Sequence, residues 1–306
     1  MGINSLIIFI YFILLSPLSF GAACCGGGSS VANLIVGDYR TQLSFGYTNM
    51  AITHTVNTDG EFIERDKNNQ EVLETMTAMA SYLAADYWQF GFSIPMHKNT
   101  HKTDYKTSNE MGVGDIKLQS AFEFMPELYY SKWKPRGFVF LQHNIINSRS
   151  VYNTKSEFAT DAFSQGFNTT TLGLYFTKII GNFDLTVSTE VHTSPARKFK
   201  SNGNEFWVTP RDGNSTQLTI GFSPQASNFH FGTNLKSSYD GAKKISGDIE
   251  SLGTSKSYTE AGLSIGLRVA DKSYNVSYTD QTFFGVAKNM NAAKIISFNL
   301  IHFLDL

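Results

Sequence analysis

The chain has 306 residues, enough for one large domain or two ordinary ones, and its formal net charge of −1 gives no support to nucleic-acid binding. Charged residues make up 17% of the sequence, below the usual share of about 25%. The 25 Phe and 14 Tyr against 3 Trp favour strands and membrane interfaces over helices.

Residues 1–23 are predicted to be a signal peptide. Leu6 to Leu15 is an apolar run broken by one Tyr, and it is too short to be a spanning helix. Gly21 and Ala23 fit the small-residue rule for cleavage after residue 23, although no Lys or Arg occurs before Arg40. No later segment is apolar enough for a transmembrane helix.

A Gly- and Ser-rich periplasmic leader is predicted over residues 24–38. Cys24 and Cys25 begin it, so no disulfide is expected in the rest of the chain. Cys24 is either a lipidation site or an incidental thiol.

From residue 39 to residue 306, stretches of about ten residues alternate apolar and polar side chains. In the first stretch Tyr39, Thr41, Leu43, Phe45 and Tyr47 share one face. Such alternation gives a strand one apolar and one polar face. The predicted strands span about residues 39–49, 72–83, 88–94, 115–124, 138–147, 167–177, 183–192, 218–222, 229–235, 260–268, 274–278 and 296–306.

The connections between these strands are alternately short and long. Short links fall near residues 84, 126, 179, 225 and 271, and long loops near 58, 104, 155, 203, 248 and 286. Outer-membrane barrels have short periplasmic turns and longer external loops. A closed sheet of tilted strands also pairs every backbone group inside a bilayer. The sequence therefore predicts an all-β fold, a transmembrane antiparallel up-and-down β-barrel of about 12 strands over residues 39–306, located in the cell outer membrane.

A soluble β-sandwich would segregate charges between its faces in the same way. The barrel prediction therefore depends on the loop alternation, on the final strand running to the C-terminus and on the export signal. Twelve strands fall between filled eight-stranded barrels and open sixteen-stranded ones, so a narrow pore or a small-ligand pocket is expected.

The polar faces are predicted to line the barrel interior, because a Lys or Arg facing lipid at the bilayer midplane costs about 2–4 kcal/mol. The faces of the second and fifth strands stay unassigned. Asp115, Lys117 and Glu123 on one strand either form an ion-pair ladder with their neighbours or are charges that select solutes. The lumen-lining candidates are Arg40, Gln42, Asp115, Lys117, Gln119, Glu123, Asp184, Glu190, His192, His230, Glu260 and Arg268.

The histidines raise the alternative of an enzyme. Outer-membrane phospholipases with twelve strands use a Ser/His pair with an Asn, and His143, Asn144 and Ser148 lie near one strand end. No motif of that family surrounds them and no G-x-S-x-G occurs, so the chain is predicted not to be an enzyme. No metal-ligand spacing accompanies His192 or His230, and no cofactor is expected.

Phe206 and Trp207 lie in a predicted external loop. They either contact a ligand or a neighbouring surface, or fold into the lumen as a constriction.

The segment from Asp86 to Phe124 resembles outer-membrane channels of the meta-pathway phenol-degradation family. The residues that carry this resemblance are the strand Tyr87-Trp88-Gln89-Phe90-Gly91-Phe92-Ser93-Ile94-Pro95 and, after a polar loop, Gly112-Val113-Gly114-Asp115-Ile116-Lys117-Leu118. The match covers about forty residues. The resemblance implies a barrel that takes up small hydrophobic compounds, and it identifies no substrate.

Three functions follow as expectations. The first is a channel or transporter for small solutes, hydrophobic or aromatic ones among them, by passive diffusion through a polar-lined lumen. The second is a structural or surface-interaction barrel acting through its external loops near residues 155 and 203, and the third is a phospholipase. Membrane lipid and a small-molecule solute are the expected partners, and the oligomeric state stays open.

Overall fold

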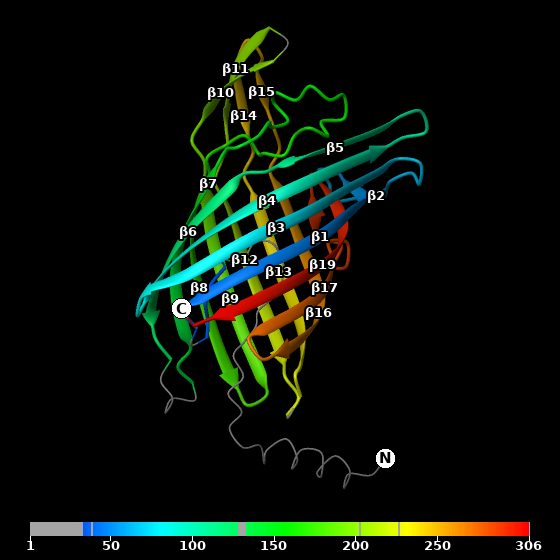
Figure 1. The fold of residues 1–306 in the computed structure, drawn as a ribbon. Helices are drawn as coiled ribbons and strands as arrows, with labels where there is room; N and C mark the ends of the chain where they lie inside the picture. The colour runs from blue at the N-terminus through cyan, green and yellow to red at the C-terminus, as the bar shows by residue number, and fades with distance from the viewer. Residues whose placement is uncertain (1–32, 38, 128–132, 202, 226, 306) are drawn as a thin grey trace.

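The structure is a computed structural model that describes residues 33–37, 39–127, 133–201, 203–225 and 227–305. The predicted signal peptide and both cysteines lie outside these residues. Every regular element in the described ranges is a β-strand (Figure 1). None of the described residues forms a helix that is long and apolar enough to cross a membrane.

Twelve described strands form one closed antiparallel barrel (Figure 1). Each strand pairs with the next along the chain, and β1 pairs with β19, where Thr41 lies opposite Leu304. The predicted all-β barrel is therefore confirmed. Its strands are β1 (Thr41–Val56), β3 (Gln70–Ala85), β4 (Trp88–Lys102), β6 (Ile116–Met125), β7 (Arg136–Ile145), β8 (Thr170–Ile180), β9 (Phe183–Thr193), β12 (Gly213–Phe222), β13 (Phe229–Asp240), β16 (Lys256–Val269), β17 (Lys272–Asp280) and β19 (Met290–Leu304).

The sequence placed the starts of β1 and β8 too early. β1 begins at Thr41 and not at Tyr39. β8 begins at Thr170 and not near Phe167, because Phe167 is buried in an aromatic cluster above the barrel. Other strands are longer than predicted at the long-loop end. There β1 and β4 continue past the barrel wall and pair with the short strands β2 (Phe62–Glu64) and β5 (Thr107–Val113).

The outer surface of the barrel carries an apolar band. On β4, Trp88, Phe90 and Phe92 are each about half exposed, at 47%, 51% and 48%. Large side chains left this exposed in a continuous surface need an apolar medium, and lipid supplies it. Polar pairs flank the band. Glu74 and Lys98 form an ion pair at the long-loop end (2.5 Å), and Asp271 and His302 form a hydrogen bond at the short-turn end (2.5 Å). The chain is therefore an outer-membrane β-barrel.

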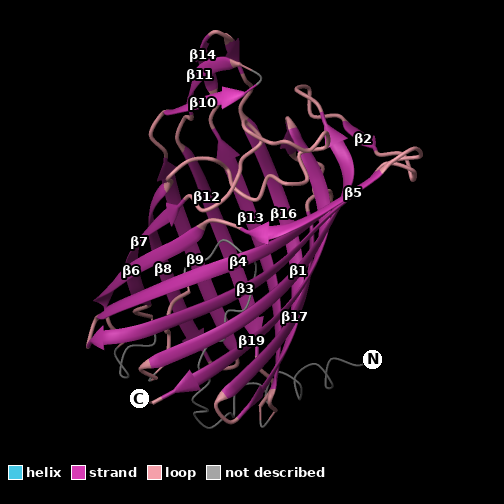
Figure 2. Cartoon of the chain, turned by 45° about the horizontal axis from the view of Figure 1, so that its top comes forward, coloured by secondary structure: helices cyan, strands magenta, loops and turns pink. Residues whose placement is uncertain are grey.

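A second sheet stands above the long-loop end (Figure 2). It contains β10 (Arg197–Ser201), β11 (Asn204–Thr209), β14 (Lys244–Gly247) and β15 (Ser251–Leu252), and we call it the cap sheet. One further short strand, β18 (Ala287–Lys288), pairs with β16.

The cap sheet has a core of its own. Phe199, Phe206 and Val208 pack with Phe167 from the loop before β8. Trp207 points to the opposite face and is 49% exposed. The two loop aromatics therefore play different parts. Phe206 is a core residue of the cap and not a lumen constriction, whereas Trp207 is open to a neighbouring surface.

Candidate functional site: the lumen and the leader

The predicted lumen residues near the short-turn end make close polar contacts. Asp184 lies 3.6 Å from His230 Nδ1, and the His230 ring also hydrogen-bonds Ser223 at 3.1 Å. Arg268 donates to the hydroxyl of Tyr39 at 3.2 Å. Tyr39 stacks on Phe303, which is buried, with ring centroids 4.9 Å apart. Tyr39 was expected to face outward with Leu43, but it precedes β1, where strand alternation has not begun.

A second tier of predicted residues lies nearer the long loops. Glu190 accepts a hydrogen bond from Ser215 at 2.8 Å, and Glu260 accepts one from the Gln281 amide at 3.0 Å. His192 hydrogen-bonds Asp240 at 2.9 Å. This tier therefore gathers three carboxylates and one histidine from several strands.

Lys117 interacts electrostatically with Glu190, Asp115 and Lys236, which reach it from three different strands or strand ends. Asp115 itself accepts from the Asn147 backbone (3.2 Å) and from Ser164 (2.7 Å) in the loop that follows β7. Arg40 lies just before β1 and is exposed. Of the ladder of ion pairs with neighbours that was one alternative for Asp115, Lys117 and Glu123, the structure shows the pair between Glu123 and Arg136 on the adjacent strand β7.

Residues 33–37 of the predicted leader lie inside the barrel, and we call this segment the seated leader. The Gln89 amide accepts from the Ile35 backbone N–H at 2.7 Å and donates to the Ile35 carbonyl at 3.3 Å. Ser81 donates to the Asn33 carbonyl at 2.7 Å, and Gln42 donates to the Asn33 side chain at 2.7 Å.

Gln119 completes the set around Asn33. Its side-chain oxygen accepts from the Asn33 backbone N–H at 3.0 Å, and its amide nitrogen lies 3.4 Å from the Asn33 carbonyl. Polar side chains from β3, β4 and β6 thus bind the backbone of the seated leader, and one from β1 binds the Asn33 side chain. Gln42 and Gln119 were predicted to line the lumen, and both bond this segment.

An apolar wall covers the other side of the seated leader. Phe138, Phe140 and Tyr175 are 0–2% exposed and pack with Ala121 and Leu34, and Val36 adjoins them. We call Ala121, Phe138, Phe140 and Tyr175 the aromatic wall. The inward direction of Phe138 and Phe140 assigns the fifth predicted strand, whose two faces were indistinguishable because Val139 and Leu141 on the outer face are apolar as well.

An ion pair lies at the lower edge of the aromatic wall. Arg136 binds both carboxylate oxygens of Glu123, at 2.6 and 2.8 Å, and donates to the Val36 carbonyl at 2.5 Å. Glu123 is only 6% exposed. Glu123 was predicted from the sequence, whereas Arg136, the first residue of β7 after Pro135, was not.

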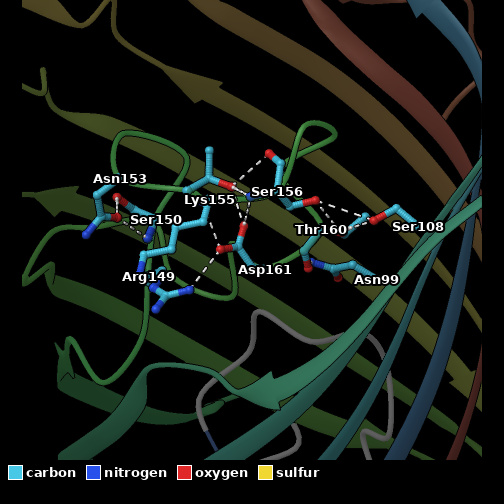
Figure 3. Close-up of polar contacts among 10 residues, drawn as sticks. Asn99, Ser108, Arg149, Ser150, Asn153, Lys155, Ser156, Thr160 and Asp161 are labelled. Atoms are coloured by element: carbon cyan, nitrogen blue, oxygen red, sulfur yellow. Dashed lines mark hydrogen bonds and ion pairs between the residues drawn. The ribbon is translucent and has the colours of Figure 1, made fainter. Parts of the chain in front are cut away.

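The loop of residues 146–169 contacts β4 and β5 at the long-loop end of the barrel (Figure 3). Asn99 on the inner face of β4 donates to the carbonyls of Thr160 and Ala162, at 3.0 and 3.3 Å. The hydroxyls of Ser108 on β5 and Thr160 hydrogen-bond at 2.7 Å. We call residues 146–169 the mouth loop.

Asp161 holds the mouth loop together from within (Figure 3). Its carboxylate accepts from the Thr154 hydroxyl, from the backbone N–H groups of Lys155 and Ser156, and from Arg149. Burial by itself would raise the pKa of Asp161. The hydrogen bonds outweigh burial and lower the pKa from 3.8 to about 2.

The histidine near the fifth strand does not face the lumen. His143 lies on the outer face of β7 with Leu141 and Ile145, and it hydrogen-bonds Thr170 at 3.0 Å. In the described ranges, no three His, Cys, Asp or Glu side chains come together in a way that suits a metal ion.

No family model matches this sequence, and no curated protein is similar to it. Solved structures do match its fold. The COG4313 outer membrane channel from Pseudomonas putida F1 has a TM-score of 0.68 at 11% identity, over 89% of this chain and 100% of that chain. The resemblance to outer-membrane channels is thereby confirmed at the level of the fold.

Two further structures are less similar. The transport unit of the autotransporter AIDA-I from Escherichia coli has a TM-score of 0.48 at 9% identity, over 90% of this chain and 93% of that chain. The Pseudomonas putida toluene transporter TodX has a TM-score of 0.45 at 10% identity, over 86% and 88%. At TM-scores this low, neither likeness supports an argument about function.

Proposed function

We propose that this protein is an outer-membrane channel through which small solutes, hydrophobic or aromatic ones among them, diffuse passively. The observation that carries the proposal is the seated leader. A segment outside the barrel strands occupies the lumen, and side-chain hydrogen bonds and packing hold it there. Such a segment can move while every strand-to-strand hydrogen bond of the barrel stays intact.

The wall opposite the seated leader supports a water-accessible path. Its inward glycines on β12 and β16 sit under polar side chains. A Cβ at Gly221 would lie 2.1 Å from Asp184 Oδ2, and one at Gly262 would lie 2.1 Å from Asn234 Oδ1. The side chains of Asp184 and Asn234 therefore lie flat against the inner surface of the barrel at these glycines. The side-chain oxygens of Asn234 and Asn275 are buried without a partner among the described residues, so water is expected beside them.

The charges of the lumen favour neutral solutes. Lys117 and Lys236 are offset by Glu190 and Glu260, so these four residues form no ring of a single sign that would select one kind of ion. The predicted lumen-lining role of these residues is part of this proposal. It requires no cofactor and no catalytic step.

Two measurements test the proposal. Planar bilayers report ion conductance, and uptake of a hydrophobic fluorescent dye by a Gram-negative host reports passage of apolar solutes. The test protein carries Asn33→Cys and Gln42→Cys on a Cys24→Ser/Cys25→Ser background, because the Asn33 and Gln42 side chains hydrogen-bond at 2.7 Å. The reduced form of this protein is the control for its oxidised form. Oxidation should lower conductance and dye uptake, and a reductant should restore both. Equal values for oxidised, reduced and protein-free samples would refute the channel.

The cap sheet supports a second candidate, a barrel that binds partners through its external loops. Trp207 is half exposed on an ordered sheet that has its own core, and Lys198 is its register partner on β10. Replacing Trp207 with Ser should then weaken surface binding to cells and leave conductance unchanged. Unchanged binding in this variant would remove the candidate.

A further inference from the structure

An open pocket lies where the outer wall of the barrel meets the cap sheet. Its volume is about 480 Å³, within the usual size range of sites that hold small molecules. The residues that line it come from the end of β7, from both ends of the mouth loop and from the link that leads from β9 into β10. They are Ile145, Ile146, Asn168, Pro195, Ala196 and Arg197. We call this cavity the rim pocket.

The rim pocket lies at the height of lipid headgroups. Leu141, Leu172 and Val191 are register partners on adjacent strands, and each is about half exposed on the outer face, so this row belongs to the apolar band. The next outward residue on β7 is the polar His143, and Ile145 follows it. Ile145 is about 13 Å beyond Leu141 along the strand, or about 10 Å along the membrane normal at the usual tilt. This height corresponds to headgroups and not to acyl chains.

Arg197 brings a positive charge to the rim pocket and is held in place there. One guanidinium N–H donates to the Gly166 carbonyl at 3.0 Å, and the guanidinium carbon lies 5.3 Å from the centroid of the Phe199 ring. No carboxylate of the described residues forms an ion pair with Arg197. A guanidinium has five N–H donors in a planar fork that matches phosphate geometry. Arg197 is therefore oriented by the protein and lacks an anion.

The other residues of the rim pocket add a second donor and an apolar surface. The Asn168 side-chain oxygen accepts from the Ile146 backbone N–H at 3.2 Å, so the NH₂ group of this amide is the part that can bind a ligand. Ile145 is exposed on the outer face of β7, above Leu141 on the same face. A cation and an amide donor thus stand at the upper end of an apolar surface, an arrangement that suits a phosphate group attached to a lipid chain.

We infer that the rim pocket binds the anionic phosphate headgroup of a lipid in the outer leaflet, with the phosphate on the Arg197 guanidinium and the lipid chain along Ile145 and Leu141. An anionic headgroup is favoured over a zwitterionic one because a zwitterion carries its own cation, whereas Arg197 lacks a counterion. A lipid bound there contacts both β7 and the start of β10, so it ties the cap sheet to the barrel rim. The site lies outside the lumen, and the inference does not depend on the channel function.

The experiment measures protection of a thiol in the rim pocket. Ala196 is replaced with Cys in the full chain on the Cys24→Ser/Cys25→Ser background. The protein is folded into phosphatidylcholine vesicles with or without lipid A, whose headgroup is a phosphorylated sugar, and an uncharged water-soluble maleimide reports access. Lipid A should slow labelling saturably, by about tenfold when about nine-tenths of the pockets are occupied. Ser251→Cys, on the exposed strand β15, is the matched control and should label at one rate throughout.

Charge variants at adjacent positions separate binding in the pocket from attraction to the surface. Arg197→Gln should abolish the protection by lipid A. Lys198→Gln removes the same charge and should retain the protection, because Lys198 is on the opposite face of β10, where it pairs with Glu205 at 2.5 Å. Arg197→Lys keeps the charge without the planar fork, so half-maximal protection should require more lipid A. If Arg197→Gln alters labelling in pure phosphatidylcholine, which would indicate a misfolded cap sheet, the comparison of Arg197→Lys with Lys198→Gln is the test.

Three results would overturn the inference. Equal labelling of Ala196→Cys with and without lipid A would show that the headgroup does not enter the rim pocket. Equal protection in Arg197→Gln, Arg197→Lys and their parent would show that the phosphate does not bind this guanidinium. Equal protection by millimolar inorganic phosphate in vesicles without lipid A would assign the site to a soluble anion. Each of these results leaves the channel proposal standing, because none of them concerns conductance or dye uptake.

Discussion

Replacing Gln89 with Ala should raise the open probability of the channel. Gln89 makes two hydrogen bonds to Ile35, at 2.7 and 3.3 Å, and both residues are 2% exposed. A hydrogen bond of this kind contributes about 0.5–1.5 kcal/mol net, so the pair stabilises the seated leader by about 1–3 kcal/mol. The ratio of displaced to seated leader should therefore rise by about 5-fold to 150-fold in Gln89→Ala.

Single-channel recording in planar bilayers measures this ratio as open probability. Gln217→Ala is the matched control, because Gln217 is a buried glutamine on β12 whose amide hydrogen-bonds Thr219 on its own strand. It should leave the open probability at the wild-type value even if it changes the unitary conductance. An unchanged open probability in Gln89→Ala would refute the reasoning that these two hydrogen bonds keep the channel closed.

Three other perturbations have defined outcomes. Arg136→Gln leaves Glu123 buried without its cation, and it should lower the free energy of unfolding by about 3–5 kcal/mol in urea titrations of the barrel in vesicles, with partial recovery on adding Glu123→Gln. The pKa of Asp161 is lowered in the folded state. The stability that its carboxylate contributes to the folded protein is therefore complete above pH 3.8 and is lost as the pH falls through about 2. Asp161→Asn should accordingly speed proteolysis of the mouth loop at neutral pH, by an amount corresponding to at most about 2 kcal/mol, and equal rates in both proteins would contradict the hydrogen-bond network. Oxidising a Ser108→Cys/Thr160→Cys pair should hold the mouth loop on β5 and reduce dye uptake reversibly; unchanged uptake in the oxidised protein would show that solutes bypass this loop.

The strands could be predicted because their signal is local. Each strand faces lipid on one side and the lumen on the other, so apolar and polar side chains alternate with a period of two residues within every segment. Where both faces carry apolar residues, as in Phe138, Val139, Phe140 and Leu141, the period disappears. The inward direction of Phe138 and Phe140 then became visible only in the barrel, where Tyr175 and Leu34 cover them.

The pairings inside the lumen could not be predicted from the same pattern. Asp184 meets His230 across β12, and Glu123 meets Arg136 across a turn. Those contacts depend on strand register and on the closure of the barrel, which alternation along one strand does not encode.

The sequence by itself determined the strands, their number and the loops that are long or short, because bilayer thickness and backbone pairing constrain each segment separately. Only the tertiary structure placed residues 33–37 against the aromatic wall and the mouth loop against β4 and β5. Both segments lack a periodic pattern of their own, and their positions follow from hydrogen bonds and apolar contacts with strands distant in sequence.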